Sequence, residues 1–376
     1  MVHSRYFIVV VSVITVFSFA SLTEVIPTTT TLAQTEQVPQ FERDPSWPKP
    51  LPNNWRLGIV WGVAVDPQDH VWVLHAADNY RDEIEDEGKV PAPPVIEFDP
   101  EGNLLRAWGG RDQGYPWFYR MDSQRLSRID SQPHPVREHA LNVDHRGNIW
   151  ISGGGHLVLK FSPDGEFLLQ IGELGKTSGS NHTEHLGNPS NVDFDPQTNE
   201  VYIADGYLNK RVVVYDADTG EYKRHWGRYG NVPDDSFEAG ALPAWSGFPG
   251  PTGVFPRFAH GANISNSSLV YVADRAHNLI HVYESDGTFL KEGPTPGPIN
   301  SVAFSADPDQ YYLYGAGINA AGKIYIMRRE DLKVLGEFDS AGQHFFDIDS
   351  HGNLFTCGLF MPEKLTLTHT PNRGGR

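Results

Sequence analysis

Short apolar runs alternate with turn residues along most of the chain, and residues 188–227 display the repeating unit. This stretch holds four runs rich in Val, Ile, Tyr and Trp, separated by Asp-Pro-Gln-Thr-Asn, Asp-Gly and Asp-Thr-Gly. Runs of this length with period-two alternation and turn residues between them predict a four-stranded antiparallel meander. The predicted strands are Asn191–Phe194, Glu200–Ala204, Arg211–Asp216 and Tyr222–Trp226.

The same pattern returns in other parts of the chain. The first two runs recur in residues 62–75, 139–152, 260–274, 300–315 and 344–358, and the last two in residues 93–109, 156–172, 279–293 and 323–338. One meander cannot bury both of its faces alone, so the copies predict an all-β, six-bladed β-propeller with four-stranded antiparallel blades. The last copy is short, and we expect a segment before Trp61 to supply its outermost strand.

The two ends of the chain carry a different pattern. A basic start and an apolar run over residues 6–20, followed by small residues, are typical of a secretory signal peptide cleaved after Ala20 or Ala33. An uncleaved N-terminal anchor is the alternative, but the run is short for a membrane span. We expect an exported protein, periplasmic or secreted, without stable membrane insertion. Its expected parts are a signal peptide with disordered spacer (1–33), the propeller (34–370) and a disordered tail (371–376).

Composition limits the partners. The formal net charge of −17 argues against a nucleic-acid or anionic-membrane surface as the partner. Cys357 is the single cysteine, so no intramolecular disulfide can form. We interpret it as a buried small hydrophobe, with a reactive thiol as the alternative. The sequence leaves the oligomeric state open.

Three insertions interrupt the repeat, and they are Ala76–Ala92, Gly110–Glu138 and Asn231–Ala259. The first contains the acidic stretch DEIEDEG, interpreted as a solvated loop rather than a cation site. The other two are rich in aromatic residues and proline. Long loops at one end of a rigid scaffold are where binding sites form, although packed lids without a ligand are the alternative.

One position is shared by all six units. Counting back five residues from the residue that ends each first strand gives Trp61, His139, Ser190, His260, Asn300 and His344. Alternate units thus carry histidine, and because first strands surround a propeller's axis, the three imidazoles are expected about 120° apart and facing it. Each histidine alone has a structural explanation, but three in six by chance is on the order of one in a thousand. This arrangement is typical of Zn²⁺ with an open position, with Fe²⁺, Cu²⁺ and Co²⁺ as alternatives.

The stretches VYIADGYLNKRVVVYDADTGEYKRHWG and YVADRAHNLIHVY resemble the NHL-repeat propeller of peptidyl-α-hydroxyglycine α-amidating lyase and its bacterial relatives. The resemblance runs from about Gly62 to Gly358. It implies a metal-dependent lyase with a small-molecule or peptide substrate, in which N–CH(OH)–COO⁻ is cleaved to an amide and glyoxylate. The positions matching the family's functional residues are His139, His260 and His344 for zinc, Tyr207 for the base, and Arg275 for an arginine that would hold the substrate carboxylate.

The chain departs from that family at two positions. The family has a His-Arg pair after the second strand of the first blade, whereas this sequence has His75-Ala76, which makes Arg81 the nearby candidate for substrate binding. The family's third histidine precedes an aspartate that helps bind a structural Ca²⁺, but Phe345 stands here, so the resemblance does not carry Ca²⁺ over. Tyr207 packed between blades and Arg275 paired with an acidic side chain remain alternatives to the implied roles.

Two further expectations complete the sequence-based interpretation. Asp205 and Arg211 end and begin neighbouring strands, and NHL repeats use such a pair as a structural ion pair within a blade. The competing function is a non-enzymatic exported propeller that binds a protein or glycan through its loop face. It would explain the aromatic insertions and the acidic surface without a metal.

Overall fold

Six four-stranded antiparallel sheets make up almost all of the described chain, as the repeat predicts. The computed structural model describes residues 37–76, 78–118, 138–236, 259–317, 322–340, 342 and 344–371. These belong to one compact unit that starts at Gln37. The expected signal peptide and spacer lie outside the described residues. No helix in the described part of the chain is long and apolar enough to cross a membrane.

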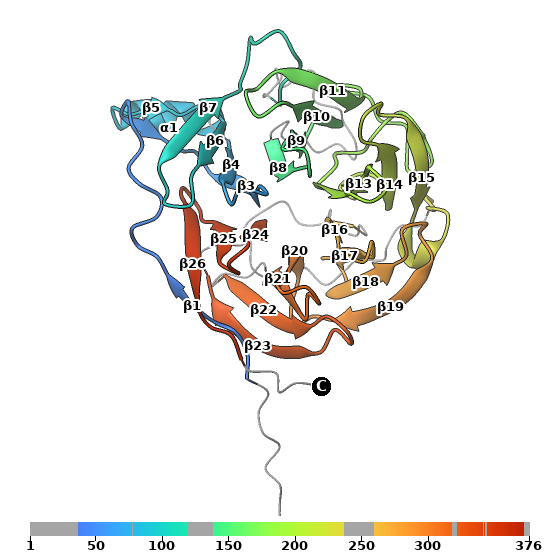
Figure 1. Ribbon diagram of the computed structural model, residues 1–376. Coiled ribbons are helices and arrows are strands. Elements are labelled where there is room, and N and C mark those ends of the chain that lie inside the picture. The colour runs from blue at the N-terminus through green and yellow to red at the C-terminus, as the bar shows by residue number, and fades with distance from the viewer. Residues whose placement is uncertain are drawn as a thin grey trace, which may run out of the picture. The chain divides into compact units, whose positions relative to one another are not determined.

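Each blade runs from an inner first strand to an outer fourth strand (Figure 1). The first blade contains β3 (Val60–Val65), β4 (Val71–His75), β6 (Val95–Phe98) and β7 (Leu104–Trp108). The second contains β8 (Glu138–Val143), β9 (Ile149–Gly153), β10 (Leu157–Phe161) and β11 (Phe167–Gly172). The third contains β12 (Asn191–Asp195), β13 (Glu200–Asp205), β14 (Arg211–Asp216) and β15 (Tyr222–Trp226). The fourth contains β16 (Gly261–Ile264), β17 (Val270–Asp274), β18 (Leu279–Tyr283) and β19 (Phe289–Pro294). The fifth contains β20 (Ile299–Phe304), β21 (Tyr312–Gly317), β22 (Lys323–Arg328) and β23 (Val334–Asp339). The last contains β24 (Phe346–Ile348), β25 (Leu354–Cys357), β26 (Pro362–His369) and β1 (Gln40–Arg43).

The apolar core lies between neighbouring blades. Successive residues of a strand point to opposite faces of its sheet. In β4, Val71 and Val73 accordingly pack toward the last blade, whereas Trp72 and Leu74 pack toward the second. Inner strands therefore need apolar side chains on both faces, which explains why their sequences read as nearly continuous apolar runs.

An aromatic residue occupies the same position in the second strand of every blade. The six residues are Trp72, Trp150, Tyr202, Tyr271, Tyr314 and Phe355. Each pairs with an equivalent residue of the first strand, and these partners are Ala64, Asn142, Asp193, Asn263, Ala303 and Asp347. All six are buried. The two tryptophans also donate Nε1–H to the aspartates that end the first strands, Asp66 and Asp144, at 3.0 Å in both blades. The repeat is thus fixed by packing and by a local hydrogen bond.

Side chains on the inner strands also tie neighbouring blades together. Asp193 Oδ2 accepts the Ile264 N–H of the next blade at 2.9 Å, and Asp347 Oδ2 accepts the Val65 N–H at 2.8 Å. The second contact joins the last blade to the first. Burial raises the pKa of Asp193 to about 7 and that of Asp347 to about 6, so these contacts carry a solvation cost.

The N-terminal strand closes the ring, as the short last copy predicts. β1 pairs antiparallel with β26, and Figure 1 shows the two strands side by side at the outer edge of the last blade. The Phe41 ring of β1 stacks on Phe338 at 5.0 Å and meets Tyr314 edge-on at 5.8 Å, both from the fifth blade. Closure therefore combines strand pairing with aromatic packing and covers an edge that would otherwise be open.

The first insertion forms short elements beside the first blade. It contains η1 (Asp78–Tyr80), the acidic helix α1 (Arg81–Asp86) and β5 (Val90–Pro91), which pairs in parallel with β2 (Trp55–Arg56). Ile84 anchors α1, while its acidic side chains are exposed. The central parts of the other two insertions lie outside the described residues. The remaining short element, η2 (Arg228–Gly230), follows β15.

Replacing Phe41 with alanine should weaken the closure of the ring. The variant loses the contacts with Phe338 and Tyr314, and we expect the free energy of unfolding to fall by about 1–2 kcal/mol, as befits a half-buried aromatic ring. Thermal or denaturant unfolding measures the change. Glu42→Ala, at an exposed position of the same strand, is the control. Equal stability of the two variants would contradict a role of Phe41 in closure.

Candidate metal centre

The structure brings His139, His260 and His344 together at the axis of the ring. His139 lies in β8. His260 directly precedes β16, and His344 lies two residues before β24. The ligand atoms of the three imidazoles all lie within 4.8 Å of one another. Their ring centroids are 4.5–5.5 Å apart. His139 and His260 are buried, and His344 is half-buried.

Backbone carbonyl groups fix the protonation of these rings. Nδ1 of His139 lies 2.7 Å from the Ser190 carbonyl oxygen, and Nδ1 of His260 lies 2.8 Å from that of Asn300. Nδ1 of His344 lies 2.7 Å from the carbonyl oxygen of Trp61. Because a carbonyl oxygen can only accept, each Nδ1 carries the proton, and in the neutral ring each Nε2 presents its lone pair.

The carbonyl partners come from the three positions of the shared register that are not histidine. A histidine in each even blade is thus oriented by the next odd blade along the ring. Burial lowers the pKa of His260 well below its usual value, and the charges of Arg275 and the other two histidines lower it further. The site therefore favours neutral imidazoles, which is the form that binds a metal ion.

Aromatic rings surround the imidazoles. The Phe345 ring lies 4.2 Å from the ring of His344 and 5.6 Å from those of His139 and His260. Phe345 also lines a cavity of about 490 Å³ bounded by inner strands of all six blades. It therefore separates the histidines from that cavity, and a phenyl ring offers no oxygen to a Ca²⁺ ion. Trp61 stacks on His139 at 6.3 Å and meets His344 edge-on at 5.3 Å.

Tyr207 faces the histidines. Its hydroxyl oxygen lies 2.8 Å from Nε2 of His139 and 3.1 Å from Nε2 of His260. The phenol is half-buried and comes from the loop between β13 and β14. The phenol thus points toward the histidines rather than away from them, and a catalytic role of Tyr207 stays a prediction. A hydroxyl at this place can exchange a proton with a group bound at the three Nε2 atoms.

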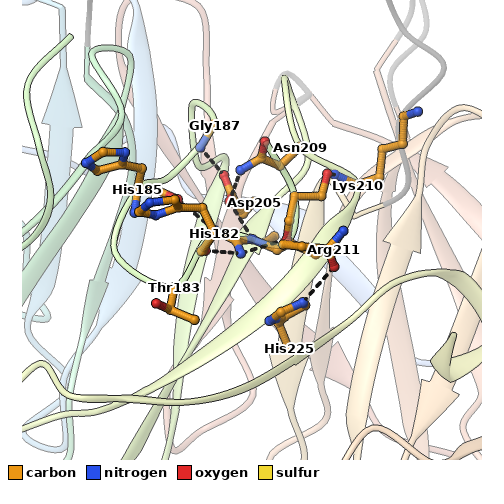
Figure 2. A network of polar contacts seen from close by, with 12 residues as sticks. His182, Thr183, His185, Gly187, Asp205, Asn209, Lys210, Arg211 and His225 are labelled. Carbon is orange, nitrogen blue, oxygen red and sulfur yellow. Dashed lines mark hydrogen bonds and ion pairs between the residues drawn. The ribbon is translucent and has the colours of Figure 1, made fainter. Parts of the chain in front are cut away.

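A buried ion pair holds the loop that carries Tyr207 (Figure 2). Asp205 and Arg211 are paired across β13 and β14, and both are fully buried, with Nε 2.9 Å from Oδ2. Asp205 also accepts hydrogen bonds at 2.6 Å from the Gly187 N–H and from Asn209 Nδ2. The expected structural pair is confirmed, and it fixes both ends of the five-residue connection around Tyr207.

The same arginine anchors the segment that leads into the third blade. Its Nη1 donates to the carbonyl oxygens of Ser180 and His182 at 2.7 and 2.6 Å, and its Nη2 donates to that of His185 at 2.8 Å. Figure 2 shows His182 and His185 beside this network. The guanidinium is thus bound through all three nitrogens, which meets the requirement that a buried charge be paired and hydrogen-bonded.

Arg275 lies in the corresponding loop of the fourth blade. Its guanidinium carbon lies 5.5 Å from the centroid of the Tyr207 ring, and its Nη1 donates to Asn300 Oδ1 at 3.0 Å. The preceding residue, Asp274, holds the loop. Although burial opposes its ionisation, hydrogen bonds from His277 and His281 keep the pKa of Asp274 at about 2. Arg275 is thereby placed next to the phenol and the histidines.

The structure does not bring Arg81 to this group by any described contact. Its guanidinium lies 2.9 Å from Asp78 and 3.4 Å from Glu85, and the side chain is about half exposed. His75 is fully buried, accepting the Gly58 N–H at Nδ1 and donating from Nε2 to the Pro93 carbonyl oxygen. Burial lowers its pKa to about 4, so it is a neutral structural residue. A role of Arg81 in substrate binding stays a prediction.

Two other candidates have structural explanations. Asp66, His70 and Glu97 form a second cluster of potential ligands within the described residues. His70 lies 2.8 Å from Glu97, whose other oxygen pairs with Arg106 at 2.6 Å, so both Glu97 oxygens already have partners. Cys357 is buried, and burial raises the pKa of its thiol to about 12. This agrees with the interpretation of Cys357 as a buried hydrophobe.

Sequence reasoning identified the three histidines but missed the groups that orient and enclose them. Trp61, Ser190 and Asn300 occupy the same register position in the other three blades, and this shared position was the sequence signal that could have identified them. Their backbone carbonyl groups, rather than their side-chain types, act on the histidines, so composition could not reveal the role. Phe345 was noticed only as a departure, whereas it contacts all three rings.

No family model matches the sequence. Peptidyl-glycine alpha-amidating monooxygenase B of Xenopus laevis is 25% identical over 266 residues, covering 67% of this chain and 26% of that protein. Peptidyl-alpha-hydroxyglycine alpha-amidating lyase 2 of Drosophila melanogaster is 29% identical over 185 residues, covering 44% and 39%. NHL repeat-containing protein 3 of Homo sapiens is 25% identical over 314 residues, covering 79% and 72%.

These relatives confirm the resemblance noted in the sequence: homologues of this chain include amidating lyases and NHL-repeat proteins. The chain spans between about a quarter and a third of the length of the two Xenopus laevis monooxygenases that it matches.

Arg211→Met should destabilise the fold strongly. It leaves the Asp205 carboxylate buried without its cation and three carbonyl oxygens without a donor, and we expect a loss of about 3–5 kcal/mol in the free energy of unfolding. Arg146→Met removes an exposed ion pair with Asp218 and should cost at most about 1 kcal/mol. Denaturant unfolding of both variants compares them. Equal losses would show that the buried pair is not needed for stability.

Proposed function

We propose that this protein is a metal-dependent lyase that cleaves the C–N bond of a small hydroxylated substrate. The observation that carries the proposal is the convergence of three Nδ1-protonated imidazoles from alternate blades, with ligand atoms within 4.8 Å of one another. The hydroxyl of Tyr207 beside two of the Nε2 atoms adds a proton-transfer group. The similarity to an amidating lyase of Drosophila melanogaster supports the reaction class.

His139, His260 and His344 are the residues that would hold the metal ion. Zn²⁺ suits them best, because catalytic zinc sites use three protein ligands and keep one position open. Fe²⁺, Cu²⁺ and Co²⁺ accept the same ligands. A bound ion of this kind would supply Lewis-acid chemistry, which makes a coordinated hydroxyl group more acidic.

The proposed substrate contains N–CH(OH)–COO⁻, in which a hydroxyl group and an amide nitrogen share one carbon. Arg275 binds the carboxylate through charge-assisted hydrogen bonds, and Tyr207 acts as the general base that accepts the hydroxyl proton. The O–H electron pair becomes the C=O bond of glyoxylate as the C–N bond breaks. The nitrogen keeps the C–N electron pair and takes up the proton, which gives the amide.

The first blade argues for a small N-acyl hydroxy acid rather than a peptide. Ala76 stands where the resembled family has an arginine, and it is fully buried. The described contacts of Arg81 are with acidic neighbours. A peptide substrate would thus find one positive group fewer in this protein than in the resembled family. The signal-peptide pattern at the start of the chain supports export as part of the proposal.

The purified protein should bind close to one equivalent of Zn²⁺ after reconstitution, measured by elemental analysis. His260→Ala should lower the affinity by more than about 100-fold, because two imidazoles cannot replace the third. His351→Ala, at an exposed histidine outside the site, is the control and should bind like the wild type. A wild-type protein that holds no transition metal would favour the non-enzymatic binding function instead.

Tyr207→Phe should separate chemistry from metal binding. It removes one hydroxyl group and almost no volume, so zinc content and thermal stability should stay unchanged. Release of glyoxylate from an N-acyl-α-hydroxyglycine should slow by about 10²-fold or more, the usual contribution of a positioned acid or base. Full activity of the variant would exclude Tyr207 as the base.

A further inference from the structure

Asn300 touches both the histidine centre and the arginine beside it. It lies in β20 at the shared register position and is fully buried. Its backbone carbonyl oxygen accepts the Nδ1–H of His260 at 2.8 Å, and its side-chain Oδ1 accepts an Nη1–H of Arg275 at 3.0 Å. Because a guanidinium only donates, the amide oxygen must face the arginine.

We propose that Asn300 is a positioning residue, which holds the Arg275 guanidinium beside Tyr207 without placing a negative charge next to it. The inference rests on the proposed function, in which Arg275 binds the substrate carboxylate. The guanidinium lies 5.5 Å from the Tyr207 ring centroid, and the Tyr207 hydroxyl contacts two histidines. Fixing the guanidinium therefore fixes the distance between the carboxylate site and the proton-transfer site.

The two equivalent residues do not act on Arg275 through any described contact. Ser190 uses its hydroxyl to donate to the carbonyl oxygens of Ala204 and Ala259. Trp61 uses its ring to pack on His139 and His344. All three residues orient a histidine through the backbone, but in the described contacts the side chain of Asn300 is the one that reaches the arginine. Its side chain thus has a separate task.

The chemistry of the amide explains why asparagine suits this task. An aspartate at the same place would also accept from Arg275, but it would form an ion pair and add a negative charge that repels a substrate carboxylate. A neutral acceptor orients the guanidinium without neutralising it. Arg275 has five N–H donors in a rigid fork, so the bond to Asn300 limits the directions in which the other donors can point.

Asn300→Asp tests this logic because it preserves size and the acceptor but adds a negative charge. The zinc-reconstituted variant should bind N-benzoylglycine, a non-reacting carboxylate analogue, about 10-fold or more weakly than the wild type by calorimetry. Its affinity for the neutral N-benzoylglycinamide should stay within about twofold. Zinc content should not change, because the backbone carbonyl that orients His260 remains. In turnover, KM should rise more than kcat falls.

Asn263→Asp is the matched control. Asn263 lies on the neighbouring blade three residues after His260, and its Oδ1 accepts the Val302 N–H at 3.2 Å. This variant should bind N-benzoylglycine like the wild type. If Asn300→Asp binds it equally well, weakens the amide analogue to the same degree, or loses zinc, the assignment of Asn300 is wrong while the proposed function stands. If the wild type binds neither zinc nor N-benzoylglycine, the proposed function fails and the inference fails with it.

Discussion

The inner strands of each four-stranded sheet carry apolar side chains on both faces, and each of these sheets therefore depends on the sheets on either side. Burial of the strand side chains between neighbouring blades is the main stabilising contribution, at roughly 1.5–3 kcal/mol for each large side chain. Every blade has a neighbour on both faces only when the ring is closed. Pairing of β1 with β26 completes the last blade, and the Asp347 contact with Val65 joins that blade to the first. The site at the axis exists only because the ring closes.

The histidine centre is itself a product of contacts between blades. Each imidazole belongs to one blade and receives its orientation from a backbone carbonyl group of the next. Such partners fix each ring's tautomer and leave Nε2 unprotonated in the neutral ring, as groups behind metal-binding histidines do. Phe345 and Trp61 enclose the rings with apolar surface, which strengthens electrostatic interactions at the site.

Two loops of the same type carry Tyr207 and Arg275 to this centre, and an aspartate at the end of a second strand holds each loop. In the third blade Asp205 binds Arg211, whereas in the fourth Asp274 binds His277 and His281. Each aspartate thus holds its loop, with an arginine as the partner in the third blade and two histidines in the fourth. Both loop residues occur in the stretches that resemble the amidating lyases. Phe345, one of the two positions at which the sequence differs from the resembled lyases, contacts all three histidine rings.

The sequence by itself determined the repeat, because alternation and turn residues are local properties. The strands expected in residues 188–227 match β12 to β15 to within one residue at each end. It also placed the three histidines in one register, since a repeat puts equivalent residues at equivalent places. Only the tertiary structure decided what those residues contact. The carbonyl groups that set the tautomers, the phenyl ring among the imidazoles and the link from Asn300 to Arg275 all join segments far apart in the chain. Such contacts follow from how neighbouring blades pack in the closed ring, and no local sequence pattern encodes this packing.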